Sequence, residues 1–180
     1  MLGGDSGFFE SSSFVAVGPV ERIDHRTVVV LGQTYVIDKA TQVTSQIDLG
    51  SYVAVAGSVA TVSAVTATRV QVLPSLYVDG SSLTYVRGQV RTLSESVGRL
   101  SVGALQIDYT PSLGTTDKVV LAVGDIANFS GIKPSPSGAM LAFSTKGVTN
   151  KKSIIGGDVQ GKSIIGGDLQ GKSIIGGDAS

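Results

Sequence analysis

The stretch TVVVLGQTYVID, residues 27–38, places two short runs of β-branched and aromatic residues on either side of Gly32-Gln33. Residues 27–31 and 34–37 therefore predict two strands joined by a turn, because such side chains favour extended backbone and glycine favours a turn. Two further runs follow the same pattern: residues 52–56 and 69–73. No window carries apolar residues at helical spacing between capping residues, so we expect an all-β protein with few helices.

The chain also contains a divergent internal duplication. Two pairs of short motifs correspond at an offset of 70 residues: 17–20 with 87–90, and 37–38 with 107–108. Two further pairs correspond at an offset of 74 residues: 49–52 with 123–126, and 57 with 131. The change of offset implies four extra residues in the second copy, which we expect within residues 110–118. The sequence therefore predicts two homologous modules, residues 13–74 and 84–146.

Each module is predicted to form a small β-barrel. The strands expected in the second module are residues 88–91, 99–102, 105–109, 119–123 and 139–143. Several short strands in so small a module favour closure, because an open sheet of this size would expose two unpaired edges. Residues 75–83 connect the modules, residues 1–12 form a leader, and residues 147–180 form a tail predicted to be a β meander or ribbon.

The order of motifs in each module resembles the small OB-like barrels of an uncharacterised bacterial domain family. The order is Gly-x-Val, a strand, a turn, an Ile-Asp strand and a Gly-x-x-Val-x-Val-x-Gly strand, and it covers residues 14–73 and, more loosely, 84–146. That family is usually secreted and often occurs in tandem, so the resemblance implies two tandem OB-like barrels in an exported protein. It implies no catalytic residues, because the family has no established activity.

The composition argues against several functions. The 180 residues carry 14 basic and 14 acidic side chains, and only 16% of residues are charged. The chain therefore lacks the electrostatic attraction expected of a nucleic-acid binder. The absence of cysteine excludes disulfides and thiolate metal sites. No apolar run approaches the length needed to span a bilayer, so no membrane span is expected.

The start of the chain and its composition bear on localisation. Residues 1–7, MLGGDSG, lack the basic start and the long apolar core of a signal peptide. The low content of Lys and Glu and the abundance of Gly, Ser, Thr and Val are nevertheless typical of an exported bacterial protein. We therefore expect an extracellular or cell-surface protein whose signal peptide has been removed, with a cytoplasmic protein as the alternative.

Residues 156–163 and 166–173 both satisfy the phosphate-binding pattern G-x-x-x-x-G-K-[ST]. A phosphate-binding loop requires a helix that begins at the Lys-Ser pair and directs its N-terminal amides at the phosphate. Here Ser163 is followed by Ile-Ile-Gly-Gly-Asp, and each glycine disfavours a helix by about 1 kcal/mol relative to alanine. The pattern is therefore a by-product of a ten-residue repeat, and we expect no nucleotide or other cofactor.

That repeat is KSIIGGDVQG from Lys152, and it recurs as KSIIGGDLQG from Lys162 and as KSIIGGDAS from Lys172. Gly-Gly-Asp is a strong turn signal, so the tail is predicted to form short antiparallel strands or the half-coils of a narrow solenoid. Successive side chains on a strand point to opposite faces, so the two isoleucines of each repeat need cover on both sides. The isoleucines concerned are Ile154, Ile155, Ile164, Ile165, Ile174 and Ile175. Because burying one isoleucine contributes about 1.5–3 kcal/mol, the tail is expected to dock on a second molecule.

The leader predicts a further contact. Phe8 and Phe9 would be exposed in a flexible segment, so we expect them to dock on another surface. Residues 2–6 are similar in sequence to residues 175–180. Either this similarity is due to chance, or the leader of one subunit extends the sheet of another subunit's tail, a contact that would build an open fibre. The leading hypothesis is a non-enzymatic, exported structural protein that forms a homo-oligomer or homopolymer. The alternative is an OB-like binding module for a saccharide, a peptide or single-stranded nucleic acid.

Few residues suggest a reactive site. His25 is the only histidine and lies in a polar turn without visible partners, so we predict no catalytic residue and no metal site. Asp158, Asp168 and Asp178 resemble the aspartates of calcium-binding β-roll repeats, but the period of ten residues favours a turn-forming role. The tyrosines are expected in the barrel cores rather than stacked against nucleotide bases: Tyr35, Tyr52, Tyr77, Tyr85 and Tyr109.

Overall fold

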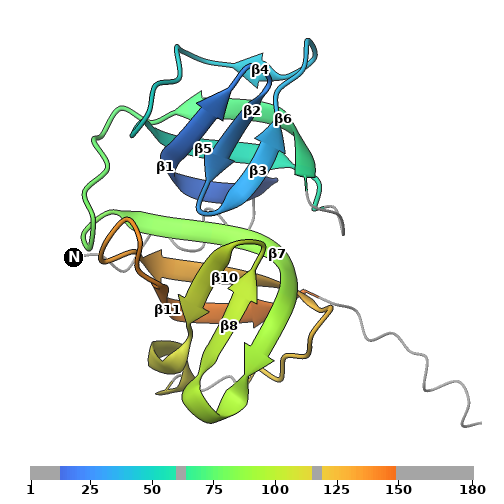
Figure 1. Ribbon diagram of the computed structural model, residues 1–180, viewed down its shortest axis with the longest axis vertical. Helices are drawn as coiled ribbons and strands as arrows, with labels where there is room; N and C mark the ends of the chain where they lie inside the picture. The colour runs from blue at the N-terminus through green and yellow to red at the C-terminus, as the bar shows by residue number, and fades with distance from the viewer. Residues whose placement is uncertain (1–12, 60–63, 115–118, 149–180) are drawn as a thin grey trace, which may run out of the picture. The chain divides into compact units, whose positions relative to one another are not determined.

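The computed structural model describes residues 13–59, 64–114 and 119–148. The chain divides into two units, Met1–Val148 and Thr149–Ser180, and all described residues belong to the first. They form eleven strands and two short 3-10 helices, with no α-helix among them (Figure 1). The prediction of an all-β protein with two small barrels is confirmed. The leader, with Phe8 and Phe9, and the repeats of the tail lie outside the described residues.

The first barrel is a closed cycle of five strands (Figure 1). They are β1 (Phe14–Asp24), β2 (Thr27–Val30), β3 (Gln33–Val36), β5 (Tyr52–Gly57) and β6 (Ala64–Val72). Neighbours pair in the order β1-β2-β3-β6-β5 and back to β1, and every pair is antiparallel except β3–β6. A short strand, β4 (Gln42–Val43), adds to β6 in parallel. The cycle is that of a small OB-type barrel.

The second barrel repeats this cycle. Its strands are β7 (Leu83–Ser94), β8 (Arg99–Val102), β9 (Leu105–Asp108), β10 (Ile126–Ile132) and β11 (Met140–Gly147), and its 3-10 helices are η1 (Glu95–Val97) and η2 (Thr110–Gly114). The order is β7-β8-β9-β11-β10 and back to β7, with β9–β11 as the parallel pair. Because the first module pairs in the same order, the internal duplication extends to the strand topology.

The structural registers correct one detail of the duplication. In the first barrel Val20 of β1 pairs with Val30, and Val28 pairs with Tyr35 of β3. In the second barrel Val90, the duplicate of Val20, pairs with Val102, and Leu100 pairs with Ile107 of β9. Ile107 therefore corresponds to Tyr35, and matching residues 37–38 with 107–108 is wrong. Two of the four extra residues lie in the β7–β8 turn, which has four residues where the β1–β2 turn has two. The other two lie between β9 and β10, so residues 110–118 do not hold all four.

Glycines at equivalent positions explain why both barrels close tightly. The register of β5 against β6 shifts at Gly57, and that of β10 against β11 shifts at Gly131. A Cβ atom at Gly57 would lie 2.9 Å from the Thr66 carbonyl oxygen, and one at Gly131 would collide with the Leu141 carbonyl oxygen. Both positions therefore require glycine for a close approach of two backbones at a β-bulge.

Residues 119–123, which we expected to form a strand, form an irregular segment before β10. Leu121 is buried, but Val120 and Val123 are exposed. Asp125 closes a turn behind them, because its carboxylate accepts a hydrogen bond from the Ala122 amide at 2.9 Å. The prediction of a strand is wrong here: Leu121 and the partly buried Val119 pack against the core, but the segment joins no strand ladder among the described residues.

The two barrels share one sheet and one core. Ala16 of β1 pairs with Val86 of β7, and Val17 pairs with Tyr85, all in antiparallel register. Ala16 and Val86 are duplicate positions, since 16 + 70 = 86, so the barrels meet through equivalent strands. One cluster of buried apolar side chains contains members from both barrels. We conclude that residues 13–148 form a single body.

Candidate functional site

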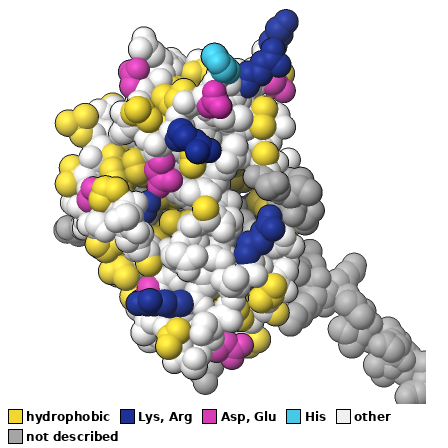
Figure 2. Space-filling view, viewed as in Figure 1, with side chains coloured by type: hydrophobic (Ala, Val, Ile, Leu, Met, Phe, Trp, Pro, Cys, Tyr) yellow, Lys and Arg dark blue, Asp and Glu magenta, His cyan; other side chains and the backbone are white. Residues whose placement is uncertain are grey.

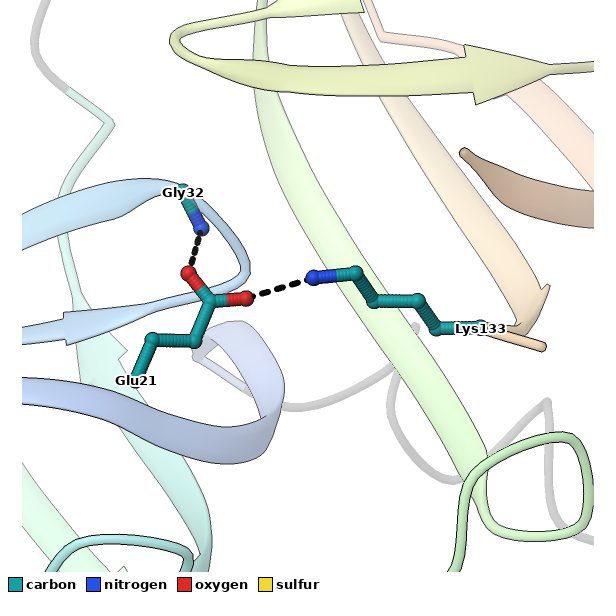
Figure 3. A network of polar contacts seen from close by, with 3 residues as sticks. All are labelled: Glu21, Gly32 and Lys133. Atoms are coloured by element: carbon teal, nitrogen blue, oxygen red, sulfur yellow. Dashed lines mark hydrogen bonds and ion pairs between the residues drawn. The ribbon is translucent and has the colours of Figure 1, made fainter. Parts of the chain in front are cut away.

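A buried ion pair joins the two barrels (Figure 3). The ammonium group of Lys133, just after β10, lies 2.6 Å from one carboxylate oxygen of Glu21 on β1. The other oxygen accepts a hydrogen bond from the Gly32 amide at 2.9 Å. The Lys133 side chain is only 7% exposed and that of Glu21 is 28% exposed. Both carboxylate oxygens are thus engaged, and the ammonium has a compensating charge where water has little access.

A second set of contacts joins the β2–β3 turn to the β8–β9 turn. The Gln33 side-chain amide donates a hydrogen bond to the Val102 carbonyl. The Ala104 amide donates to the Gly32 carbonyl at 3.3 Å. Gly32 and Gly103 both have positive φ, and a Cβ atom on Gly32 would lie 2.8 Å from the Leu105 amide nitrogen. These turns therefore pack backbone against backbone.

Beside these contacts lies a polar cleft of about 540 Å³ between β3 of the first barrel and β7 of the second. Its polar lining includes Gln33, Thr34, Arg87, Gln89, Arg91 and Thr92. The Thr92 and Ser101 hydroxyls lie 2.7 Å apart, and the Gln89 side-chain amide donates to the Gly124 carbonyl at 3.1 Å. No aspartate or glutamate is among the described residues that line the cleft. The cleft is therefore basic.

Arg87 is the unusual member of this lining. Its Nε atom is buried and has no hydrogen-bond partner among the described residues. The ion pairs in the described part of the chain are Arg99–Asp108 and Lys133–Glu21, so neither Arg87 nor Arg91 is paired with a carboxylate. A buried donor without a partner is costly, and such groups in native proteins are usually satisfied by water or a ligand.

A second candidate surface is an apolar groove on the second barrel, near η2. Its apolar members surround cavities of about 280 Å³ each, which Glu95, Ser112 and Thr145 also line: Leu93, Tyr109, Leu113, Val119, Val120 and Leu121. Leu113 is 58% exposed and Val120 is 80% exposed, whereas Tyr109 and Leu121 are buried at its floor. Burial raises the pKa of the Tyr109 phenol. We refer to these six residues as the apolar groove.

The structure also places the residues considered in the sequence. His25 is exposed in the β1–β2 turn, and no cluster of metal-ligating side chains occurs within residues 13–59, 64–114 and 119–148. Tyr35, Tyr85 and Tyr109 are buried as predicted. Tyr52 and Tyr77 are half-buried, and their rings lie 5.7 Å apart between centroids. On the face drawn in Figure 2, basic and acidic side chains are scattered rather than gathered in one area.

The assembly residues predicted from the sequence lie outside the described residues: Phe8, Phe9, Ile154, Ile155, Ile164, Ile165, Ile174 and Ile175. Sequence reasoning missed the unpaired Arg87 and the buried Lys133. Arg87 carried a usable signal, because the duplicate position in the first barrel is the apolar Val17, which is fully buried. Lys133 carried none, because its partner Glu21 is 112 residues away in the chain.

Comparisons with known proteins give one family match. No curated protein matches the chain. Among solved structures, drosophila Unr CSD456 is similar at 14% sequence identity, covering 81% of this chain and 67% of that chain, but its TM-score of 0.28 is too low to support a shared fold. None of the helices described here is long and apolar enough to cross a membrane. Residues 17–71, within the first barrel, match the family described as domain of unknown function DUF5666.

Proposed function

We propose that this protein is a non-enzymatic, exported structural protein in which the repeat tail of one copy docks on the barrel body of another. The observation that carries the proposal is the apolar groove, which leaves Leu113 and Val120 exposed beside the buried Tyr109 and Leu121. Exposed apolar side chains scattered singly are ordinary, but several gathered around a cavity are typical of a docking surface.

The tail supplies a matching occupant. Thirty-two residues follow Val148, since 180 − 148 = 32, and they contain three Ile-Ile pairs spaced ten residues apart. Burying one isoleucine contributes about 1.5–3 kcal/mol, so a pair seated in the groove would supply a substantial part of a binding free energy. Fully extended, ten residues span about 33 Å, so successive pairs could reach grooves on different copies.

The strand edges of the barrels offer little for assembly. Both strand cycles are closed, and the first half of β1 is covered by β5 on one side and by β7 on the other. Closed cycles leave few unpaired backbone groups for edge-to-edge pairing between copies. A contact between the tail of one copy and the groove of the next is heterologous, and such contacts build rings or open filaments.

Sedimentation velocity and electron microscopy of the full chain test this proposal. We expect assemblies, and we expect Val120→Asp or deletion of residues 149–180 to leave folded monomers. Leu76→Asp is the matched control, because Leu76 is 87% exposed but lies outside the groove, and it should assemble like the natural sequence. Circular dichroism verifies that each variant keeps its β structure. Assembly that persists in both the deletion and Val120→Asp contradicts the proposal.

A second candidate function, an OB-like binding module, is favoured by the polar cleft between the barrels. The unpaired Arg87 and the exposed Arg91 give this cleft a feature that barrel packing alone does not require. The two functions use different surfaces, so one chain could combine them.

A further inference from the structure

We propose that the cleft between the two barrels binds an oxyanion, a carboxylate or phosphate group carried by a small polar ligand. This proposal rests on the second candidate function, the binding module, and names the class of ligand. The site is independent of assembly, because the cleft and the apolar groove share no lining residue.

Arg87 has hydrogen-bonding capacity that the fold leaves unsatisfied. Its Nε atom is buried without a partner among the described residues, and no ion pair engages its guanidinium. A guanidinium presents a planar set of donors that matches two oxygens of a carboxylate or phosphate. An oxyanion in the cleft would pair with a guanidinium whose charge no carboxylate among the described residues balances.

The charges that line the cleft are all positive. Arg87 and Arg91 both line the cleft, and the described lining residues contain no carboxylate to oppose an anion. The carboxylate of Glu21 on β1 reaches the nearby β2–β3 turn, where the Gly32 amide and Lys133 hold it. Its negative charge is therefore compensated, and two unopposed guanidinium groups favour an anionic ligand.

The remainder of the cleft lining is mostly polar and uncharged. Side-chain amides and hydroxyls come from Gln33, Thr34, Gln89 and Thr92, while Val59 and Val65 provide a small apolar part. A volume of about 540 Å³ is in the range of small-ligand sites. Neutral donors and acceptors around a basic centre suit a ligand that carries hydroxyl groups as well as its anion, such as a sugar acid or a sugar phosphate.

The duplicate of Arg87 in the first barrel is an apolar residue. The position of Arg87 in the second barrel corresponds to Val17 in the first, and Val17 is fully buried in an apolar cluster with Ala54 and Tyr85. The two copies share a strand order but differ in the chemistry of this side chain. The charge at residue 87 is therefore not a requirement of the barrel itself.

Titration calorimetry on the full chain tests the proposal with sodium phosphate, sodium glucuronate and glucose as probes. We expect saturable binding of phosphate, glucuronate or both, weakened by added salt, and no binding of glucose at the same concentration. Binding of phosphate alone identifies a phosphate ligand, and binding of glucuronate alone identifies a sugar acid; either result supports the site. Absence of binding by both anions at millimolar concentrations overturns it.

Variants locate the site. Arg87→Gln and Arg91→Glu should each weaken binding at least about tenfold, since a charge-assisted hydrogen bond is lost or an anion is repelled. Arg91 is exposed, so Arg91→Glu should fold even if Arg87→Gln does not. Arg99→Gln is the matched control, because Arg99 lies beside Asp108 and outside the cleft, and it should bind normally. Unchanged binding in folded Arg91→Glu contradicts the proposal. Val120→Asp should keep this binding, which separates it from assembly.

Discussion

The two barrels have the same strand order but use their outer surfaces differently. Val17 in the first barrel is buried, whereas its counterpart Arg87 in the second opens into a cleft. The segment between β3 and β5 is largely polar and exposed, whereas its counterpart between β9 and β10 contains most of the apolar groove. Both candidate sites therefore depend on the second barrel, while the duplicated glycines stay in place. Both barrels therefore keep the glycines that allow close backbone contacts, while the side chains that could bind a ligand or a partner differ between them.

The largest expected effect concerns the duplicated bulge glycines. Gly131→Ala should destabilise the protein by about 3 kcal/mol, because its Cβ would collide with the Leu141 carbonyl, an atom of the backbone. Gly57→Ala should cost less, about 1–2 kcal/mol, because its Cβ would lie 2.9 Å from the Thr66 carbonyl oxygen. Urea unfolding of both variants measures the difference. Equal free energies of unfolding for the two variants would contradict a tighter backbone contact at Gly131 than at Gly57.

A smaller effect is expected at the ion pair that joins the barrels. Glu21→Ala leaves the Lys133 ammonium buried without its partner and the Gly32 amide without its acceptor. Breaking a buried pair costs about 3–5 kcal/mol, and because Glu21 is 28% exposed we expect about 2 kcal/mol. Asp24→Ala, in the exposed β1–β2 turn, is the control and should lose less than half as much. Equal unfolding temperatures for these two variants would show that the ion pair does not stabilise the contact between the barrels.

The smallest effect appears only at alkaline pH and distinguishes the barrel cores. Burial, reinforced by Tyr85, raises the pKa of Tyr35 well above its ordinary value of 10.0, whereas its counterpart Ile107 cannot ionise. Above pH 10 the unfolded chain loses the Tyr35 proton while the native protein keeps it, so stability is full below pH 10 and falls as the pH rises. Tyr35→Phe should flatten this fall, as measured by urea unfolding between pH 9 and about pH 11. If the unfolding free energy of Tyr35→Phe falls with pH as steeply as that of the natural sequence, the raised pKa of Tyr35 is contradicted.

Much of the fold could be predicted from local sequence. Alternating β-branched residues and glycine turns located most strands, and matching motifs revealed the duplication, because both signals are local or periodic. The prediction of a strand over residues 119–123 is wrong, because local preference for extended backbone does not show whether a segment finds a strand to pair with. The correspondence of Tyr35 with Ile107 was missed because the two extra residues of the β7–β8 turn are visible only in the strand registers.

The candidate sites were less accessible to sequence reasoning. The cleft combines residues 32–35 with residues 87–92, and its existence depends on how β1 pairs with β7. The buried Lys133 lies in a segment of Pro, Ser and Gly that is typical of an exposed loop. Only packing between the barrels shows that its ammonium reaches Glu21. Long-range pairings of this kind leave no periodic trace in the chain.

The most direct test of the assembly proposal is to titrate the barrel body, residues 1–148, with the repeat peptide of residues 162–171. The closed strand cycles and the core lie within this body, so it should fold without the tail. We predict amide chemical-shift changes confined to the apolar groove, centred on Val120 and Leu121, and none with a peptide in which Ile164 and Ile165 are replaced by serine. Shifts elsewhere, or no shifts at all, would contradict docking of the tail on this groove.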